Sequence, residues 1–170
     1  MKATLLCLLA SGSLLVSCAT ANIQGTDIPD TPQNRAVIQV FFEYVEAVKA
    51  QNADKLLALV SEHYLDANGT DEATDDVDYE GVKKFVNSDA YRNIRAVSTF
   101  FIVKDMSVSP DEQTAKILYY YEVRIKTDRL APPEEGSSIN SDTQKWLKET
   151  EVNQMLLKKE GDKWKIVSGL

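Results

Sequence analysis

Residues 115–125 read Ala-Lys-Ile-Leu-Tyr-Tyr-Tyr-Glu-Val-Arg-Ile, and this stretch decides the class of fold. Side chains of a β-strand point alternately to the two faces of a sheet. Every second position, from Ala115 to Ile125, is apolar or aromatic, while Lys116, Glu122 and Arg124 stand among the others. The alternation predicts a strand with one buried face and one exposed face.

Further strand patterns stand on both sides of this one. Val97–Val108 is rich in strand-forming residues, and Ser109–Glu112 has the proline of a turn. Downstream, Trp146–Lys159 predicts a long strand, which Gly161-Asp162 turns into a last strand over Lys163–Val167. The second half of the chain therefore predicts an antiparallel meander.

The first half has a helical period instead. Thr31-Pro32 is a favourable helix start, with a capping hydroxyl and a proline at the first helical position. The apolar positions that follow share one helix face. They are Val37, Val40, Phe41, Tyr44, Val45 and Val48.

Two shorter helices are predicted after the first. Asn52 can cap one that ends near Tyr64, and Asp78 can cap another whose buried face we expect to hold Val82, Phe85 and Val86. Helices followed by an antiparallel meander define an α+β fold.

Three segments together resemble the NTF2-like superfamily, which includes the SnoaL-like proteins. They are the helix 37–51, the Asn-Ala-Asp at 52–54 that opens a helix toward His63-Tyr64, and the final Glu-Gly-Asp-Lys-Trp-Lys-Ile-Val at 160–167. The resemblance covers residues 34–170. It implies a cone in which N-terminal helices pack on a curved antiparallel sheet around a pocket.

Two stretches depart from the family pattern. The hairpin that many relatives place after the second helix falls in Asp66–Asp78, which is poor strand material, and Leu130–Asp142 resembles an inserted loop. The acidic stretch does not match a calcium loop, because Asp71 stands where an EF-hand needs glycine and Val77 where it needs glutamate. We expect a solvated acidic loop there.

Composition narrows the function. The 170 residues carry a net charge of −7 with no basic stripe, which argues against nucleic acid as a partner. His63 is the only histidine, so a histidine-rich metal site is excluded and catalysis through His63 is disfavoured. The sequence predicts no cofactor and no metal.

The resemblance implies where a functional site would lie. Tyr44, Tyr119 and Tyr121 are expected to line the pocket of a non-catalytic module that binds a small apolar ligand or another envelope protein. In the alternative, a small isomerase, dehydratase or hydrolase, Tyr64 and Asp66 would be the working pair, since enzymes of this fold use an Asp base in an apolar cone. A third hypothesis is an interaction domain whose cone is filled by its own side chains.

The last hairpin also suggests a partner. Pairing across Gly161-Asp162 puts Leu157 opposite Ile166 on one face and Leu156 opposite Val167 on the other. Apolar residues on both faces, together with the family resemblance, favour a homodimer through the outer sheet face.

The N-terminus predicts export. Lys2 and a short apolar run are followed by Leu15-Val16-Ser17-Cys18, which resembles the lipobox of bacterial lipoproteins. This implies a signal peptide over 1–17, lipid on Cys18, a flexible linker over 18–33 and a place in the cell envelope, at the outer membrane facing the periplasm. Without Lys2 the charge becomes −8. An ordinary secretory signal with an incidental cysteine is the alternative.

Overall fold

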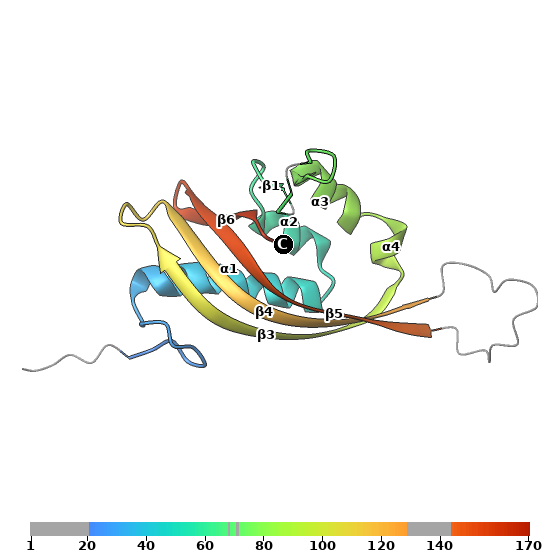
Figure 1. Ribbon diagram of the computed structural model, residues 1–170, viewed down its shortest axis with the longest axis horizontal. Helices are drawn as coiled ribbons and strands as arrows, with labels where there is room; N and C mark the ends of the chain where they lie inside the picture. Colours follow the sequence, from blue (N-terminus) through green and yellow to red (C-terminus); the bar gives the residue numbers. More distant parts are fainter. Residues whose placement is uncertain (1–20, 68, 71, 129–143) are drawn as a thin grey trace, which may run out of the picture.

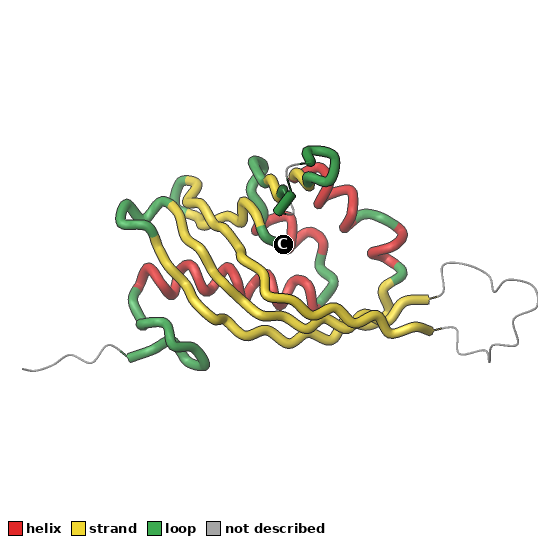
Figure 2. Tube along the Cα trace, in the orientation of Figure 1, coloured by secondary structure: helices red, strands yellow, loops and turns green. Residues whose placement is uncertain are grey.

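The computed structural model describes residues 21–67, 69–70, 72–128 and 144–170. Helices come first in the chain and lie together on one side of a long curved sheet (Figures 1 and 2). The helices are α1 (Pro32–Lys49), α2 (Ala53–Leu59), α3 (Tyr79–Val86) and α4 (Asp89–Arg92). The strands are β1 (Leu65–Asp66), β2 (Val77–Asp78), β3 (Ile94–Val108), β4 (Thr114–Asp128), β5 (Gln144–Glu160) and β6 (Lys163–Ser168).

The large sheet is an antiparallel meander in the order β3-β4-β5-β6, as the sequence predicts. The turn at Ser109–Glu112 forms, since the Glu112 N–H donates to the Ser109 carbonyl at 2.9 Å. Leu157 pairs with Ile166 as expected, but Leu156 stands opposite Ser168 rather than Val167. A register shift between Leu156 and Leu157 causes the difference, because a bulge adds a residue to one strand only.

The inner sheet face and the apolar face of α1 form the core. Ala115, Ile117 and Tyr119 are buried, which confirms the strand alternation, and Phe41 of α1 packs on Tyr119 with ring centroids 5.0 Å apart. Thr31 caps α1 through a hydrogen bond from the Asn34 N–H, as its position predicts. Further along β4 the inner residues become only partly buried, because the helices leave a cavity there.

The second helix is shorter than the sequence predicts. It ends at Leu59, and Val60 then forms a parallel bridge with Ile166 of β6. Ser61 is fully buried, and its N–H donates to the Ile166 carbonyl at 2.9 Å. Pairing with the sheet edge thus replaces the expected last helical turns and carries the chain toward Tyr64.

The acidic stretch does form a small hairpin. Leu65 pairs with Asp78 and Asp66 with Val77. The hairpin therefore forms with strands of only two residues, although the sequence of this stretch is poor strand material. Asp78 caps α3 as predicted, accepting from the Gly81 N–H at 2.8 Å.

One core prediction for α3 is wrong. Val82 and Val86 are buried, but Phe85 is 57% exposed because its ring lies at the cavity wall against Tyr91. Tyr91 belongs to α4, a single turn that the sequence did not predict.

The outer sheet face carries exposed apolar side chains, which we call the outer apolar patch. Ile102, Tyr120 and Val152 are neighbours across three strands, and Phe100 lies beside Tyr120 with ring centroids 6.4 Å apart. Phe100 and Val152 are more than half exposed. Glu122 forms ion pairs with Arg124 and Lys148 next to them, so charges of both signs adjoin the patch.

Residues 21–31, which enter α1, are folded, although the sequence assigns them to a flexible linker over 18–33; residues 18–20 of that linker lie outside the described residues. The Asp30 N–H donates to the Ala21 carbonyl at 2.7 Å, and the Ile23 N–H donates to the Ile28 carbonyl at 2.8 Å. Ile28 is buried, and Asp30 forms an ion pair with Arg35 of α1. These contacts give the segment enough partners to close as a turn beside α1 (Figure 1).

Candidate functional site

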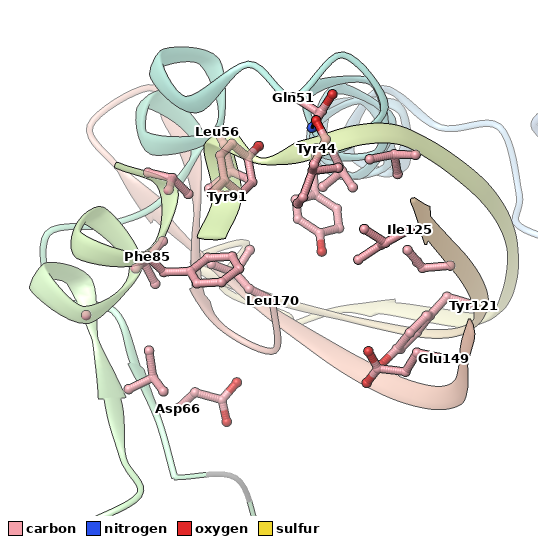
Figure 3. Close-up of a pocket in the computed structure, with 18 of the residues that line it drawn as sticks. Tyr44, Gln51, Leu56, Asp66, Phe85, Tyr91, Tyr121, Ile125, Glu149 and Leu170 are labelled. Carbon is pink, nitrogen blue, oxygen red and sulfur yellow. Dashed lines mark hydrogen bonds between the residues drawn. The ribbon is translucent and has the colours of Figure 1, made fainter. Parts of the chain in front are cut away.

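A cavity of about 550 Å³ lies between the inner sheet face and the helices. Its wall is formed by α1, α2, α3, α4, the small hairpin and β3 to β5 (Figure 3). Most of the residues that line it are aliphatic or aromatic, which is typical of small-molecule pockets of this size. The cone is therefore not filled by its own side chains.

The three tyrosines predicted from the sequence all lie on the cavity wall. Tyr44 comes from α1, and its hydroxyl points into the space (Figure 3). Burial raises the pKa of Tyr44 to about 12, with Tyr91 and Glu149 contributing. Tyr119 donates to the Gly169 carbonyl at 3.1 Å, and burial raises its pKa as well.

Tyr64 and Asp66 are brought together by the turn into β1. The Tyr64 hydroxyl donates to Oδ2 of Asp66 at 3.1 Å, and both residues line the cavity. The same Oδ2 accepts from the Gly169 N–H at 2.8 Å, while the Leu170 N–H donates to the Tyr64 oxygen at 3.2 Å. Burial raises the pKa of Tyr64 and outweighs the lowering effect of the Leu170 N–H. The pair thus fastens the end of the chain beside β1.

Tyr121 stands between two glutamates of β5. Its hydroxyl is 3.1 Å from Oε1 of Glu149 and 3.2 Å from Oε2 of Glu151, and it can donate its single proton to one of them at a time. Burial raises the pKa of Tyr121, and the hydrogen bond to Glu149 raises it further. Of the two glutamates, Glu149 lines the cavity.

Tyr91 contributes a buried polar group without a partner. Its hydroxyl oxygen has no hydrogen-bond partner among the described residues, and burial raises its pKa. Its ring lies on the cavity wall and meets Phe85 edge to face, with centroids 5.6 Å apart. The oxygen itself is enclosed by protein, so Tyr91 presents its ring, and not its hydroxyl, to the cavity.

Sequence reasoning missed Glu149, Tyr91 and Phe85 as cavity residues. A signal for Glu149 existed: it lies eight residues before the inward Leu157, and the even spacing puts both on one strand face. Tyr91 had no comparable signal, because its place depends on a four-residue helix.

Some predictions fall outside the described residues, namely the signal peptide 1–17, Cys18 and the loop Leu130–Asp142. Across the ranges described, no three His, Cys, Asp or Glu side chains come together as metal ligands. Of the helices in those same ranges, none is both long and apolar enough to cross a membrane. His63 lies exposed in the turn after α2.

Many solved structures have a similar fold. An NTF2-like protein with a cystatin-like fold from Novosphingobium aromaticivorans superposes with a TM-score of 0.57 and 13% identity, covering 81% of this chain and 79% of its own. A ketosteroid isomerase-like protein from Erwinia carotovora atroseptica superposes with a TM-score of 0.56 and 11% identity, and the match covers 82% of this chain and 95% of that protein. A hexachlorocyclohexane dehydrochlorinase superposes with a TM-score of 0.55 and 9% identity, and the match covers 80% of this chain and 81% of that enzyme.

These likenesses, with the α+β meander and its helices, show that the chain has the NTF2-like fold predicted from its sequence. The sequence matches no family model and no curated protein. At these identities the structures establish the fold alone, so function has to be argued from the cavity.

Proposed function

We propose that this domain is a binding module that holds a small, largely apolar molecule in its cone. The observation that carries the proposal is the cavity of about 550 Å³ with its aliphatic and aromatic wall. Burial of a ligand there would remove apolar surface from water on both partners. Tyr44, whose hydroxyl points into the space, supplies a polar contact that can orient the ligand.

Native mass spectrometry of the protein purified without added ligand tests this proposal. We expect a retained compound on the wild-type protein, lost in Val123→Trp, because Val123 lines the cavity and an indole would occupy it. Thr150→Trp is the matched control, since Thr150 is exposed on the outer face of the same sheet. Equal retention in both variants would contradict a ligand in the cone.

An enzyme of the isomerase, dehydratase or hydrolase type is the second candidate. The hydrogen bond between Tyr64 and Asp66 on the cavity wall favours it, and the dehydrochlorinase shows that the fold supports such an activity in another protein. We place it second because Oδ2 of Asp66 already accepts from Tyr64 and Gly169. Conversion of the retained compound by the wild-type protein, but not by a folded Asp66→Asn variant, would reverse this order.

The proposal includes a place in the bacterial envelope. Cys18, in its lipobox-like setting, would carry the lipid, and the folded segment that begins at Ala21 leaves only Ala19 and Thr20 between anchor and domain. Three residue steps reach roughly 10 Å, so the domain would sit against the bilayer rather than on a long tether. The described segment after the anchor lies beside β3, and Phe42 of α1 is exposed there.

A further inference from the structure

The charged groups on the cavity wall all have one sign. Three carboxylates line it, from Asp66, Asp76 and Glu149, and the described wall contains no lysine, arginine or histidine. A cleft with one sign of charge concentrates ions of the opposite sign and repels ions of its own. An apolar molecule with an anionic head would meet three carboxylates and no cation.

The aromatic rings of the wall add a second attraction for positive charge. Phe101, Tyr119 and Tyr121 follow one another on the sheet side, with neighbouring centroids 6.0 to 6.2 Å apart. Tyr44 faces them from α1, nearly perpendicular to Phe101 at 77°. Ring faces attract ammonium groups, so an amine in the cavity would gain from the rings that line it.

Glu149 joins the charge to the rings. Its Oε1 lies 3.1 Å from the Tyr121 hydroxyl, which can donate to it. Figure 3 shows the Glu149 carboxylate across the cavity from the Tyr44 hydroxyl. Glu149 is also one of the groups that raise the pKa of Tyr44, so its charge acts across the cavity. A cation between these residues would touch ring faces and lie near a carboxylate.

We propose that the cavity selects ligands with a positive charge, an apolar body carrying a quaternary or protonated amine. This inference rests on the proposed binding function and adds the charge of the ligand to it. The apolar body would lie against the aliphatic wall, and the amine among Tyr44, Tyr121 and Glu149. A neutral ligand of the same shape gains the apolar contacts only, and an anionic one is repelled.

Three probes of nearly equal shape separate these terms. They are benzyltrimethylammonium, the neutral neopentylbenzene and the anionic phenylmethanesulfonate, each titrated calorimetrically into the full protein held in zwitterionic lipid nanodiscs, with empty nanodiscs as the blank. We expect the ammonium probe to bind about tenfold more tightly than the neutral one, the size expected for partly desolvated cation–π contacts with a nearby carboxylate. The sulfonate should bind most weakly.

Variants identify the source of the preference. Glu149→Gln should lower the ratio of ammonium to neutral affinity several-fold. Glu151→Gln is the matched control, because Glu151 also contacts the Tyr121 hydroxyl but is not among the cavity-lining residues. It should preserve the ratio.

The outcomes are distinguishable. Equal binding of the three probes, or preference for the sulfonate, overturns the charge selectivity and leaves the binding module intact. Absence of binding by all three overturns the proposed function together with this inference. An unchanged ratio in Glu149→Gln, or an equal loss in both variants, overturns the assignment of the cation to Glu149.

Discussion

Asp66 and Gly169 are joined by a hydrogen bond of 2.8 Å, although 103 residues separate them in the chain. Asp66 ends the short strand β1, and Gly169 follows the last strand β6. The bond closes the wall of the cavity at this point, because Asp66 and the neighbouring Leu170 both line it. Tyr64 completes the arrangement by donating to the same carboxylate oxygen.

Asp66→Asn should lower the stability of the fold. The amide cannot offer the charged oxygen that accepts from Gly169 and Tyr64, and hydrogen bonds to charged groups contribute about 1.5–3 kcal/mol. We expect the free energy of unfolding to fall by about 1–2 kcal/mol, measured by urea denaturation. Asp162→Asn, in the exposed turn between β5 and β6, should have little effect. Equal losses in the two variants would argue against this role.

Gly169→Ala should destabilise the chain end more severely than other glycine substitutions. Gly169 has φ +85°, and an added Cβ would lie 1.9 Å from the Gln154 carbonyl oxygen. Gly161→Ala is the matched control: its φ is +60°, but nothing lies within 4 Å of the added atom. The control should cost about 1 kcal/mol from backbone strain alone, and Gly169→Ala clearly more. Similar melting temperatures for the two would contradict this.

The helices and strands of this fold can be predicted from the sequence more completely than the contacts between residues far apart in the chain. The alternation at 115–125 and the helical period before Val48 report local burial, so β4 and α1 lie where expected. The bond between Asp66 and Gly169 leaves no local trace, because it depends on where β1 and β6 end in space. The candidate site was therefore predictable in its inward tyrosines and not in its closure.

The charged part of the cavity shows the same limit. The spacing puts Glu149 on the strand face of Leu157, but the run Lys-Glu-Thr-Glu at 148–151 carries charge on both faces, so the pattern does not show that this face lines a cavity. The pairing of Glu149 with Val123 depends on the register of β4 and β5. A long connection separates these strands, and such a connection does not fix a register as a two-residue turn does.

The folded protein should lose stability between pH 10 and 12. The pKa of Tyr44 is raised from 10.0 to about 12, mainly by burial, so the unfolded chain releases this proton first. The contribution of Tyr44 alone is complete below pH 10 and is lost as pH rises toward 12, by roughly 2–3 kcal/mol. Tyr64, Tyr119 and Tyr121, whose pKa values are also raised, add to the loss in the same direction. Tyr44→Phe should flatten the decline in urea denaturation midpoints over this range. Tyr120→Phe, on the outer face, should keep the wild-type slope.

A second copy of the chain is the partner we expect on the outer apolar patch. Phe100, Ile102, Tyr120 and Val152 form a continuous apolar surface, and patches of this kind on one sheet face mark interaction sites. Mixed charges beside it suit a self-complementary contact. Val152→Lys should shift sedimentation from dimer to monomer, whereas Asp162→Lys, in the exposed β5–β6 turn, should not. A wild-type monomer at all accessible concentrations would exclude this partner.

Cys18→Ser should release the protein from membranes. The thiol of Cys18 is the group that the lipobox-like Leu-Val-Ser-Cys would prepare for acylation, and serine at that position offers no thioether linkage. Cys7→Ser is the matched control, because Cys7 lies within the expected signal peptide and would be removed. Fractionation and intact mass should show a membrane-bound, acylated protein for wild type and Cys7→Ser. For Cys18→Ser they should show an unacylated protein that is released from the membrane fraction.

The folded segment after the anchor makes that prediction sharper. With Ala21 already held by Asp30, an acylated Cys18 brings the β3 edge to the bilayer, and Phe42 should contact the lipid headgroup region. A spin label at position 42 should therefore lose accessibility to water-soluble relaxation agents when vesicles are present. A label at position 162, in the β5–β6 turn, should keep its accessibility. Equal accessibility at both sites, with Cys18 acylated, would mean that the segment opens into a tether and that the domain stands away from the membrane.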